Sequence, residues 1–219
     1  MIALLQEDPL AFLLAFSALV MSLVLHEVGH AYAAHLFGDD TAKRQGRLSL
    51  NPLRHLDPLG TLLLLLVGFG WARPVPIYPP AFRAYRLGLF AVSVAGILVN
   101  LALAVLFALA VRGLFALDPE GVYGAFRGSG GSALGLLALA AYVASSINLV
   151  LAVFNLLPIP PLDGSKILQS PLPCAWPPWR WRLEQYAWRS FLLILTVLRG
   201  PIQEVLAFAR QVFFTLLLG

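Results

Sequence analysis

The residues His26, Glu27 and His30 have the types and the spacing of a metal site with a general base. They lie in the run His26-Glu27-Val28-Gly29-His30, within a long apolar segment. Two histidines four residues apart on a helix lie on the same face about one turn apart, so both imidazoles can bind one zinc ion. Glu27 is then placed to take a proton from a metal-bound water. The pattern predicts hydrolytic metal chemistry.

Ionisable side chains within an apolar helix need partners inside the protein. A charge at the centre of a bilayer costs roughly 2.5 kcal/mol or more. The alternative to a metal site is a polar patch near the helix end, where His35 and Phe37 approach the interface. In such a patch, Glu27 between two histidines would gain nothing that offsets its cost. We therefore interpret the motif as a metal site.

Asp163 is the candidate for the third protein ligand that a catalytic zinc needs beside an open position. It follows an apolar segment that ends at Leu157, after a proline-rich run over 158–161 that ends the helix and extends the chain. Gly164 permits a turn beside the carboxylate. The alternative is that Asp163 caps a helix starting at Ser165. The sequence leaves both roles open.

The composition indicates what kind of protein positions these residues. Of 219 residues, 59% are hydrophobic and 12% are charged, whereas soluble domains carry about a quarter charged residues. A bilayer can cover that much apolar surface and a soluble fold cannot. No basic stripe interleaved with aromatic residues is visible, so no nucleic-acid partner is expected. The first apolar run lacks a preceding basic region and is too long for a signal sequence, so we expect it to remain as a membrane anchor.

Three apolar segments are long enough to span a bilayer, namely residues 10–37, 87–112 and 133–157. Each runs for about 25 residues or more, on the order of 38 Å of helix, against a hydrocarbon core of roughly 30 Å. We predict an α-helical polytopic membrane protein with these three core transmembrane helices. The loop over 113–132, with its glycine and serine patch, is expected to be a flexible connector.

Residues 59–71 are apolar but too short to cross the bilayer. About 13 residues give roughly 20 Å of helix. The run over 71–77 that follows carries prolines and β-branched residues, which favour extended chain. We predict a re-entrant or β-hairpin segment after the first helix. Such backbone is tolerated at membrane depth only against protein or a wet cavity.

The C-terminal part is predicted to add one or two helices. Apolar residues over 186–198 and 202–218 flank Gly200-Pro201, so two short helices or one kinked helix would both fit. We expect a single domain. Residues 1–170 would form the catalytic membrane core, and residues 171–219 would form C-terminal membrane-associated helices.

The loop charges predict the orientation of the chain. Lys and Arg concentrate in three segments, residues 38–58, 73–86 and 158–184. The 113–132 loop has one Arg beside two acidic residues. By the positive-inside rule the three basic segments face the cytoplasm, which requires residues 59–72 to enter and leave the membrane on the same side. Asp163 then emerges on the side of the two histidines. We expect an integral protein of the cell membrane, inner or plasma, with its site toward the cytoplasm.

Together these motifs resemble the site-2 proteases, which are intramembrane zinc metallopeptidases acting in regulated proteolysis. The paired motifs that carry the resemblance are His26-Glu27-x-x-His30 and Asn155-x-x-Pro158-x-Pro160-Pro161-Leu162-Asp163-Gly164. The likeness extends through residues 46–52, 55–61 and 70–76, and so covers about residues 20–170. Two departures are Ala95-Gly96-Ile97, where the family usually has Ala-Gly-Pro, and Tyr78, where Asn is common. Neither departure touches the metal set.

The resemblance implies a zinc metalloendopeptidase of the minimal form, without a PDZ-like or nucleotide-sensing domain. It implies His26, His30 and Asp163 as ligands of one Zn²⁺ per chain, Glu27 as the catalytic base, and Asn155 near a membrane protein or peptide substrate. It also implies a membrane-associated hairpin to which an extended substrate segment adds as a strand. A catalytically inactive membrane scaffold of the same fold is the alternative. The oligomeric state is left open.

Other polar residues near these motifs have two interpretations each. His55 and Asp57 either orient one another around the ligands or shape a turn. Asn100 and Asn148 either hold substrate or, as we favour, form hydrogen bonds between helices. Gly96 is interpreted as a residue of close helix packing.

Overall fold

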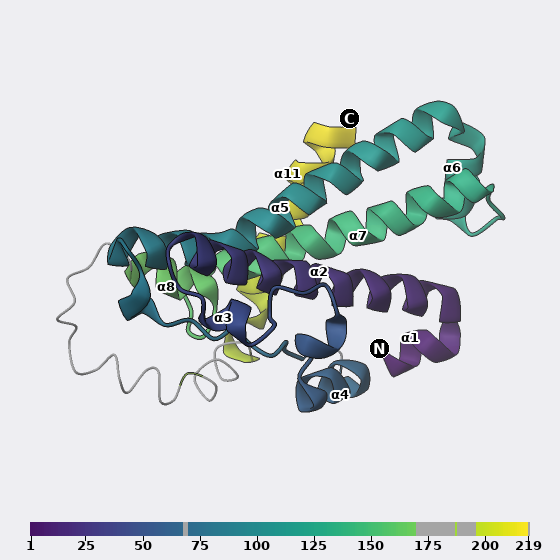
Figure 1. Cartoon of the computed structure of the whole chain (residues 1–219). Coiled ribbons are helices and arrows are strands. Elements are labelled where there is room, and N and C mark those ends of the chain that lie inside the picture. Colours follow the sequence, from purple (N-terminus) through teal and green to yellow (C-terminus); the bar gives the residue numbers. More distant parts are fainter. Residues whose placement is uncertain (68–69, 170–186, 188–195, 219) are drawn as a thin grey trace.

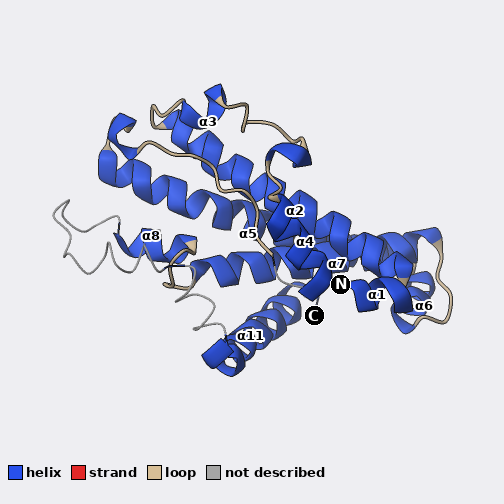
Figure 2. Ribbon diagram, turned by 90° about the horizontal axis from the view of Figure 1, so that it is seen from below, coloured by secondary structure: helices blue, strands red, loops and turns tan. Residues whose placement is uncertain are grey.

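Long apolar helices dominate the computed structural model, which describes residues 1–67, 70–169, 187 and 196–218 (Figure 1). Figure 2 shows helices and loops only, without strands, across this part of the chain. In chain order the helices are α1 (Ile2–Glu7), α2 (Pro9–Leu36), α3 (Thr41–Arg44), η1 (Pro52–Arg54), α4 (Pro58–Val67), η2 (Pro79–Ala81), α5 (Tyr85–Leu117), α6 (Pro119–Arg127), α7 (Ala133–Leu156), α8 (Asp163–Gln169) and α11 (Arg199–Leu218).

Four of these helices are long and apolar enough to cross a membrane, namely α2, α5, α7 and α11. The bounds of α2 and α7 lie within one residue of the predicted segments. The outward faces of these helices carry exposed leucines, such as Leu98, Leu101, Leu106 and Leu109 on α5. A bilayer would cover such a surface, whereas soluble proteins rarely expose a continuous apolar surface of this extent to water. The helical class predicted from the sequence is confirmed.

The connector between α5 and α7 differs from the prediction. We expected a flexible loop over 113–132, but α5 continues through Gly113 to Leu117, and α6 follows at once. The Asp118 side chain accepts a hydrogen bond from the Gly121 amide, and Pro119 occupies the first helical position, where its missing N–H costs nothing. Gly128 ends α6 with a φ of 67°. These capping residues outweigh the local glycine and serine content.

The two ends of the segment that contains α4 lie next to each other. Leu56 and Ala72 form an isolated antiparallel bridge, and the Arg73 amide donates to the His55 carbonyl at 2.7 Å. Residues 70–78 contain no helix, as the sequence predicts. A Cβ at Gly60 would lie 2.2 Å from the Trp71 carbonyl oxygen, so this close crossing requires glycine. One bridge replaces the ladder of a β-hairpin, and entry of this segment into the bilayer remains a prediction.

The C-terminal prediction is only partly covered. Apart from residues 187 and 196–198, the helix expected over 186–198 lies outside the described residues. α11 begins at Arg199, which places Pro201 in the first turn. Proline is tolerated there because amides of the first turn have no intrahelical partner. Gly200-Pro201 therefore lies at the beginning of a helix. The prediction of one or two helices over residues 186–218 is not tested further by the described residues.

Small residues bring the three central helices into close contact. α5 packs against both α2 and α7, and α2 packs against α7. Gly29 of α2 faces the Ala95 backbone of α5, and the Ser145 hydroxyl of α7 donates to the Ala104 carbonyl of α5 at 2.7 Å. α8 packs against α5 at the end of the bundle drawn on the left of Figure 1. This end gathers the C-terminal part of α2, the beginning of α5 and the chain that follows α7.

Candidate metal centre

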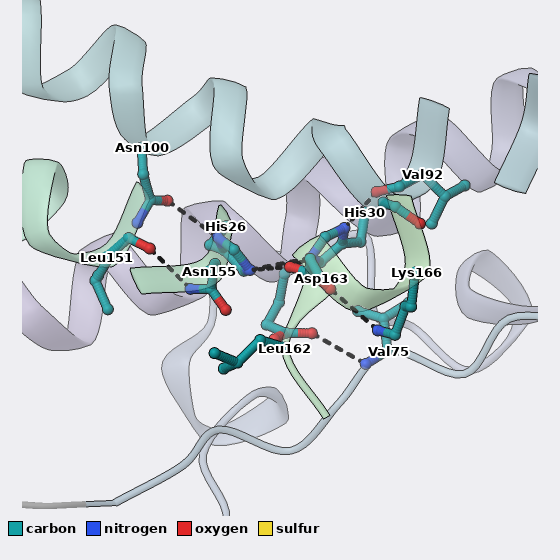
Figure 3. Close-up of polar contacts among 12 residues, drawn as sticks. His26, His30, Val75, Val92, Asn100, Leu151, Asn155, Leu162, Asp163 and Lys166 are labelled. Carbon is teal, nitrogen blue, oxygen red and sulfur yellow. Dashed lines mark hydrogen bonds and ion pairs between the residues drawn. The ribbon is translucent and has the colours of Figure 1, made fainter. Parts of the chain in front are cut away.

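Three predicted ligands from two distant parts of the chain meet inside this end of the bundle (Figure 3). His26 and His30 come from successive turns of α2, and Asp163 is the first residue of α8. The two Nε2 atoms are 3.0 Å apart, and the Asp163 Oδ2 lies 3.1 Å from His26 Nε2 and 3.0 Å from His30 Nε2. All three residues are buried. The predicted convergence of two imidazoles and one carboxylate is therefore present in the structure.

The other ring nitrogen of each histidine is held by α5. His30 Nδ1 donates to the Val92 carbonyl at 2.6 Å, and His26 Nδ1 lies 3.3 Å from Asn100 Oδ1. With the proton of each neutral ring on Nδ1, both Nε2 atoms keep a lone pair directed at the Asp163 carboxylate. Asn100 of α5 thus forms a hydrogen bond to His26 of α2, and this bond between helices also orients a candidate metal ligand.

The donor set fits a zinc ion. Two lone pairs and a carboxylate oxygen at 3.0 to 3.1 Å from one another repel unless a cation lies among them. A zinc tetrahedron with bonds of about 2.0 to 2.2 Å has edges of about 3.3 to 3.6 Å, so a shift of a few tenths of an ångström would accommodate the ion.

Asp163 does not act as the predicted alternative cap of a helix from Ser165. α8 begins at Asp163 itself, and the Ser165 hydroxyl donates to the Leu162 carbonyl at 2.7 Å. A Cβ at Gly164 would lie 2.2 Å from the Leu156 carbonyl oxygen, so only glycine allows this turn to press against the end of α7. The turn that follows the prolines therefore directs the carboxylate back into the bundle.

Glu27 lines a cavity of about 360 Å³ that also contains the three ligands. Its Oε2 accepts a hydrogen bond of 3.0 Å from the Val75 amide, in the extended segment after α4. The same segment lines the cavity through Trp71, Ala72 and Pro74. The wall is mainly apolar. Its other polar residues are Ser93, Asn155 and Lys166.

Two buried charged residues that the sequence did not single out fix the extended segment. The Arg47 guanidinium donates to the Arg73 carbonyl, and the Asp39 carboxylate accepts from the Tyr78 amide at 2.5 Å. Arg47 and Asp39 are 5% and 1% exposed, unlike the surface charges around them. Their burial could not be predicted, because both lie in a loop rich in charged residues and the sequence does not distinguish a buried loop charge from a solvated one. Val75, between the two fixed points, is thereby held against Glu27.

The structure separates the other predicted polar residues. His55 is fully buried and its Nε2 donates to the Ser49 carbonyl at 2.7 Å, while Asp57 accepts from the Gly60 amide at 2.8 Å and so caps α4. Burial lowers the pKa of His55. Neither residue lines the cavity. These contacts favour the turn-shaping interpretation over an orienting role at the ligands.

The predicted asparagines differ in their surroundings. The Asn148 amide donates to Ser22 on α2 and to its own helix, both at 2.8 Å, which is the favoured role between helices. Asn155 lines the cavity and its amide donates to the Leu151 carbonyl at 2.9 Å (Figure 3). A role of Asn155 in holding substrate remains a prediction.

Gly96 is a site residue that the sequence analysis assigned to packing alone. A Cβ at Gly96 would lie 2.5 Å from His26 Cε1 and 2.6 Å from His30 Nε2. The helix surface against which both imidazoles rest is therefore the bare backbone of α5. Its place one turn before Asn100, in the Ala95-Gly96 pair, is the signal that could have identified it.

Comparison with known proteins places this chain in a family. A family model described as Peptidase family M50 matches residues 121–198. A Bacillus subtilis (strain 168) protein named "Putative zinc metalloprotease YwhC" is 43% identical over 193 residues, which cover 84% of this chain and 79% of the relative.

More distant relatives carry a similar description. Proteins named "Putative zinc metalloprotease Rip2" from Mycolicibacterium smegmatis and Mycobacterium tuberculosis are each 36% identical, across 72% of this chain. The aligned part spans 57% of the length of these mycobacterial proteins. No solved structure matches the chain. The identity and coverage of the Bacillus relative, with the helices that could span a membrane, establish that this chain is an integral membrane protein of the site-2 protease family of zinc metalloproteases, peptidase family M50.

Proposed function

We propose that the protein is an intramembrane zinc metalloprotease that hydrolyses peptide bonds of membrane-embedded or membrane-proximal substrates. One observation carries the proposal. Two imidazole Nε2 atoms and one carboxylate oxygen converge within 4.8 Å of one another, in the same cavity as Glu27. A zinc site with three protein ligands leaves a position for water or substrate, as catalytic zinc sites require.

In this proposal His26, His30 and Asp163 hold the ion. When bound, zinc polarises the scissile carbonyl and acidifies a water molecule. Glu27 takes a proton from the attacking water as the water oxygen bonds to the carbonyl carbon, and it delivers that proton to the leaving nitrogen as the C–N bond breaks. The carbonyl oxygen of Val92 and the side-chain oxygen of Asn100 accept from the two imidazoles and keep them in the orientation that this geometry needs.

The substrate would bind as extended chain. A helical substrate keeps its carbonyls within its own hydrogen bonds, so the cut segment must unwind first. The extended segment of residues 71–77 lines the cavity and lies beside Glu27 through Val75. Addition of the substrate as a strand along this segment would bring a peptide carbonyl next to the metal site. Helix-breaking residues near the cut site should therefore favour cleavage.

We also propose that the site faces the cytoplasmic side of the cell membrane. The loop that carries α3 contains Lys43, Arg44 and Arg54 as exposed cations. Two more exposed cations lie around the start of α5, Arg83 just before the helix and Arg86 in its first turn. α3, the beginning of α5 and α8 lie toward the same end of the bundle in Figure 1. A cytoplasmic location of that end follows from the positive-inside rule.

A cleavage assay with purified protein in detergent tests the proposal. The substrate is a tagged transmembrane segment with a helix-breaking residue pair near its middle. Wild-type protein should cut it, lose activity with a chelator and regain activity with added zinc. Glu27→Gln should bind zinc as wild type does and lose activity by about 10²- to 10⁴-fold, because glutamine cannot accept the proton. Zinc-bound wild-type protein that cuts none of a panel of such substrates would instead support an inactive scaffold of the same fold, and turnover by Glu27→Gln would reject Glu27 as the base.

A further inference from the structure

The two oxygens of the Asp163 carboxylate have different partners. Oδ2 faces the Nε2 atoms of His26 and His30 at 3.1 and 3.0 Å. Oδ1 points away from them and accepts from the Lys166 ammonium at 3.0 Å (Figure 3). Among the described residues that line the cavity, Lys166 is the one Lys or Arg. It lies three residues after Asp163 on α8, a spacing that brings both side chains to one face.

We propose that Lys166 is a positioning residue that restricts Asp163 to a single oxygen ligand and so keeps one position at the metal open. This inference rests on the proposed function and deepens it. A carboxylate can bind a metal through one or both oxygens. Since the Lys166 ammonium occupies Oδ1, Oδ2 alone remains available to the ion. A second oxygen at the metal would take the position that water and substrate need.

The burial of the Asp163 carboxylate distinguishes this ion pair from one between two exposed side chains. Exposed ion pairs contribute little, because water and salt screen both charges. Here the Asp163 side chain is 7% exposed, whereas that of Lys166 is 43% exposed. Removal of Lys166 would leave Oδ1 buried without its partner, which costs more than the loss of a solvated pair. The carboxylate would then rotate toward the nearest cation, which is the metal.

The backbone around Asp163 is fixed by hydrogen bonds, so rotation of the side chain is the main movement left to its carboxylate. The Leu162 amide donates to the Ile159 carbonyl at 2.8 Å, and the Ser165 amide donates to the Leu162 carbonyl at 3.1 Å. Gly164 presses against the end of α7. Because the turn is fixed on both sides of Asp163, the direction of its carboxylate is set by what each oxygen contacts.

The metal itself is the probe for this inference. Zinc affinity is measured by competition with a chelator, and the metal environment is measured from the visible absorption of the cobalt(II)-substituted protein, which weakens when a fifth ligand binds. Lys166→Met should strengthen zinc binding by about tenfold or more, because a second carboxylate oxygen reaches the ion and a nearby positive charge is lost. It should also reduce the cobalt absorption toward that of a five-coordinate ion. Lys166→Arg, which keeps a cation for Oδ1, should restore both readings toward wild type.

Lys43→Met is the matched control, because Lys43 is the other lysine of the chain and is exposed on α3. It should bind zinc and cobalt as wild type does. If Lys166→Met does not fold, Lys166→Ala gives the same test, since it also removes the ammonium and leaves no donor for Oδ1. Wild-type zinc affinity together with an unchanged cobalt spectrum in folded Lys166→Met or Lys166→Ala would overturn the role of Lys166. Absence of zinc binding by wild type and by Lys43→Met would instead reject the proposed function.

Discussion

The Val75 amide donates a hydrogen bond of 3.0 Å to the Glu27 carboxylate, joining the extended segment after α4 to the residue beside the metal ligands. The two residues are far apart in the sequence, and neither Pro74 nor Pro76 has an amide proton to offer in place of that of Val75. The backbone that we propose to bind substrate thus also holds the carboxylate of Glu27, the proposed general base. A change in this segment should alter catalysis without altering the metal ligands.

Val75→Pro should reduce peptide cleavage while zinc remains bound. The substitution removes the amide proton that Glu27 accepts, so the carboxylate loses a partner and its fixed direction. We expect kcat to fall by about tenfold or more, since one such hydrogen bond contributes roughly 1.5 to 3 kcal/mol when it involves a charge. Val75→Ala keeps the amide and is the control. Equal cleavage rates for the two variants at equal zinc content would show that this hydrogen bond does not support Glu27.

Gly96→Ala should weaken zinc binding, because the added methyl group would overlap both ligand imidazoles. Overpacking of this kind costs about 1 to 3 kcal/mol, which corresponds to about a tenfold to hundredfold loss of affinity if the rings must move. Gly113→Ala is a control on the same helix, since no atom lies within 4 Å of its added Cβ. It should leave zinc affinity unchanged. Chelator competition measures both variants, and an equal affinity for Gly96→Ala and wild type would contradict the close contact.

Asp39→Asn should destabilise the protein at neutral pH and lose that effect in acid. Burial would raise the pKa of Asp39, but hydrogen bonds from Thr41 and the Tyr78 amide outweigh burial and hold the pKa below its usual value. A lowered carboxyl pKa stabilises the folded state above the unfolded pKa of about 3.9, and this contribution disappears as pH falls through the folded value. At pH 7 the free energy of unfolding of the variant should therefore be about 1 to 2 kcal/mol lower than that of wild type, and its melting temperature should be lower.

Melting temperatures in detergent between pH 7 and pH 3 test this pH dependence. The gap between wild type and Asp39→Asn should narrow as the pH drops below about 4. A gap that stays constant over this range would mean that the charge of Asp39 does not stabilise the fold.

The candidate spanning helices and the proposed metal ligands could be predicted from the sequence for different reasons. The extent of α2 and α7 follows from a long apolar run, which needs no knowledge of neighbours. The spacing of His26 and His30 is a local property of a helix. Asp163 required one long-range argument, in which the loop charges placed it on the side of the histidines.

Other features depend on contacts that the sequence does not display. In the sequence, Gly96 cannot be distinguished from other small residues between helices, and only the fold shows that it faces the two imidazoles. The sequence around Arg47 and Asp39 is typical of solvated loop charges, although both residues are buried. The helix α6 was missed for another reason, since Asp118-Pro119 is a local start signal that the glycine and serine content obscured.

The zinc content of purified protein before and after Asp163→Ala tests whether this carboxylate and the two histidines hold one metal ion. We expect about one zinc per wild-type chain and a loss of most of it in the variant, because two imidazoles alone do not complete a catalytic site. Helix content and melting temperature of the metal-free forms show whether the variant is folded. Unchanged zinc occupancy in folded Asp163→Ala would remove this carboxylate from the metal and contradict the convergence on which the mechanism depends.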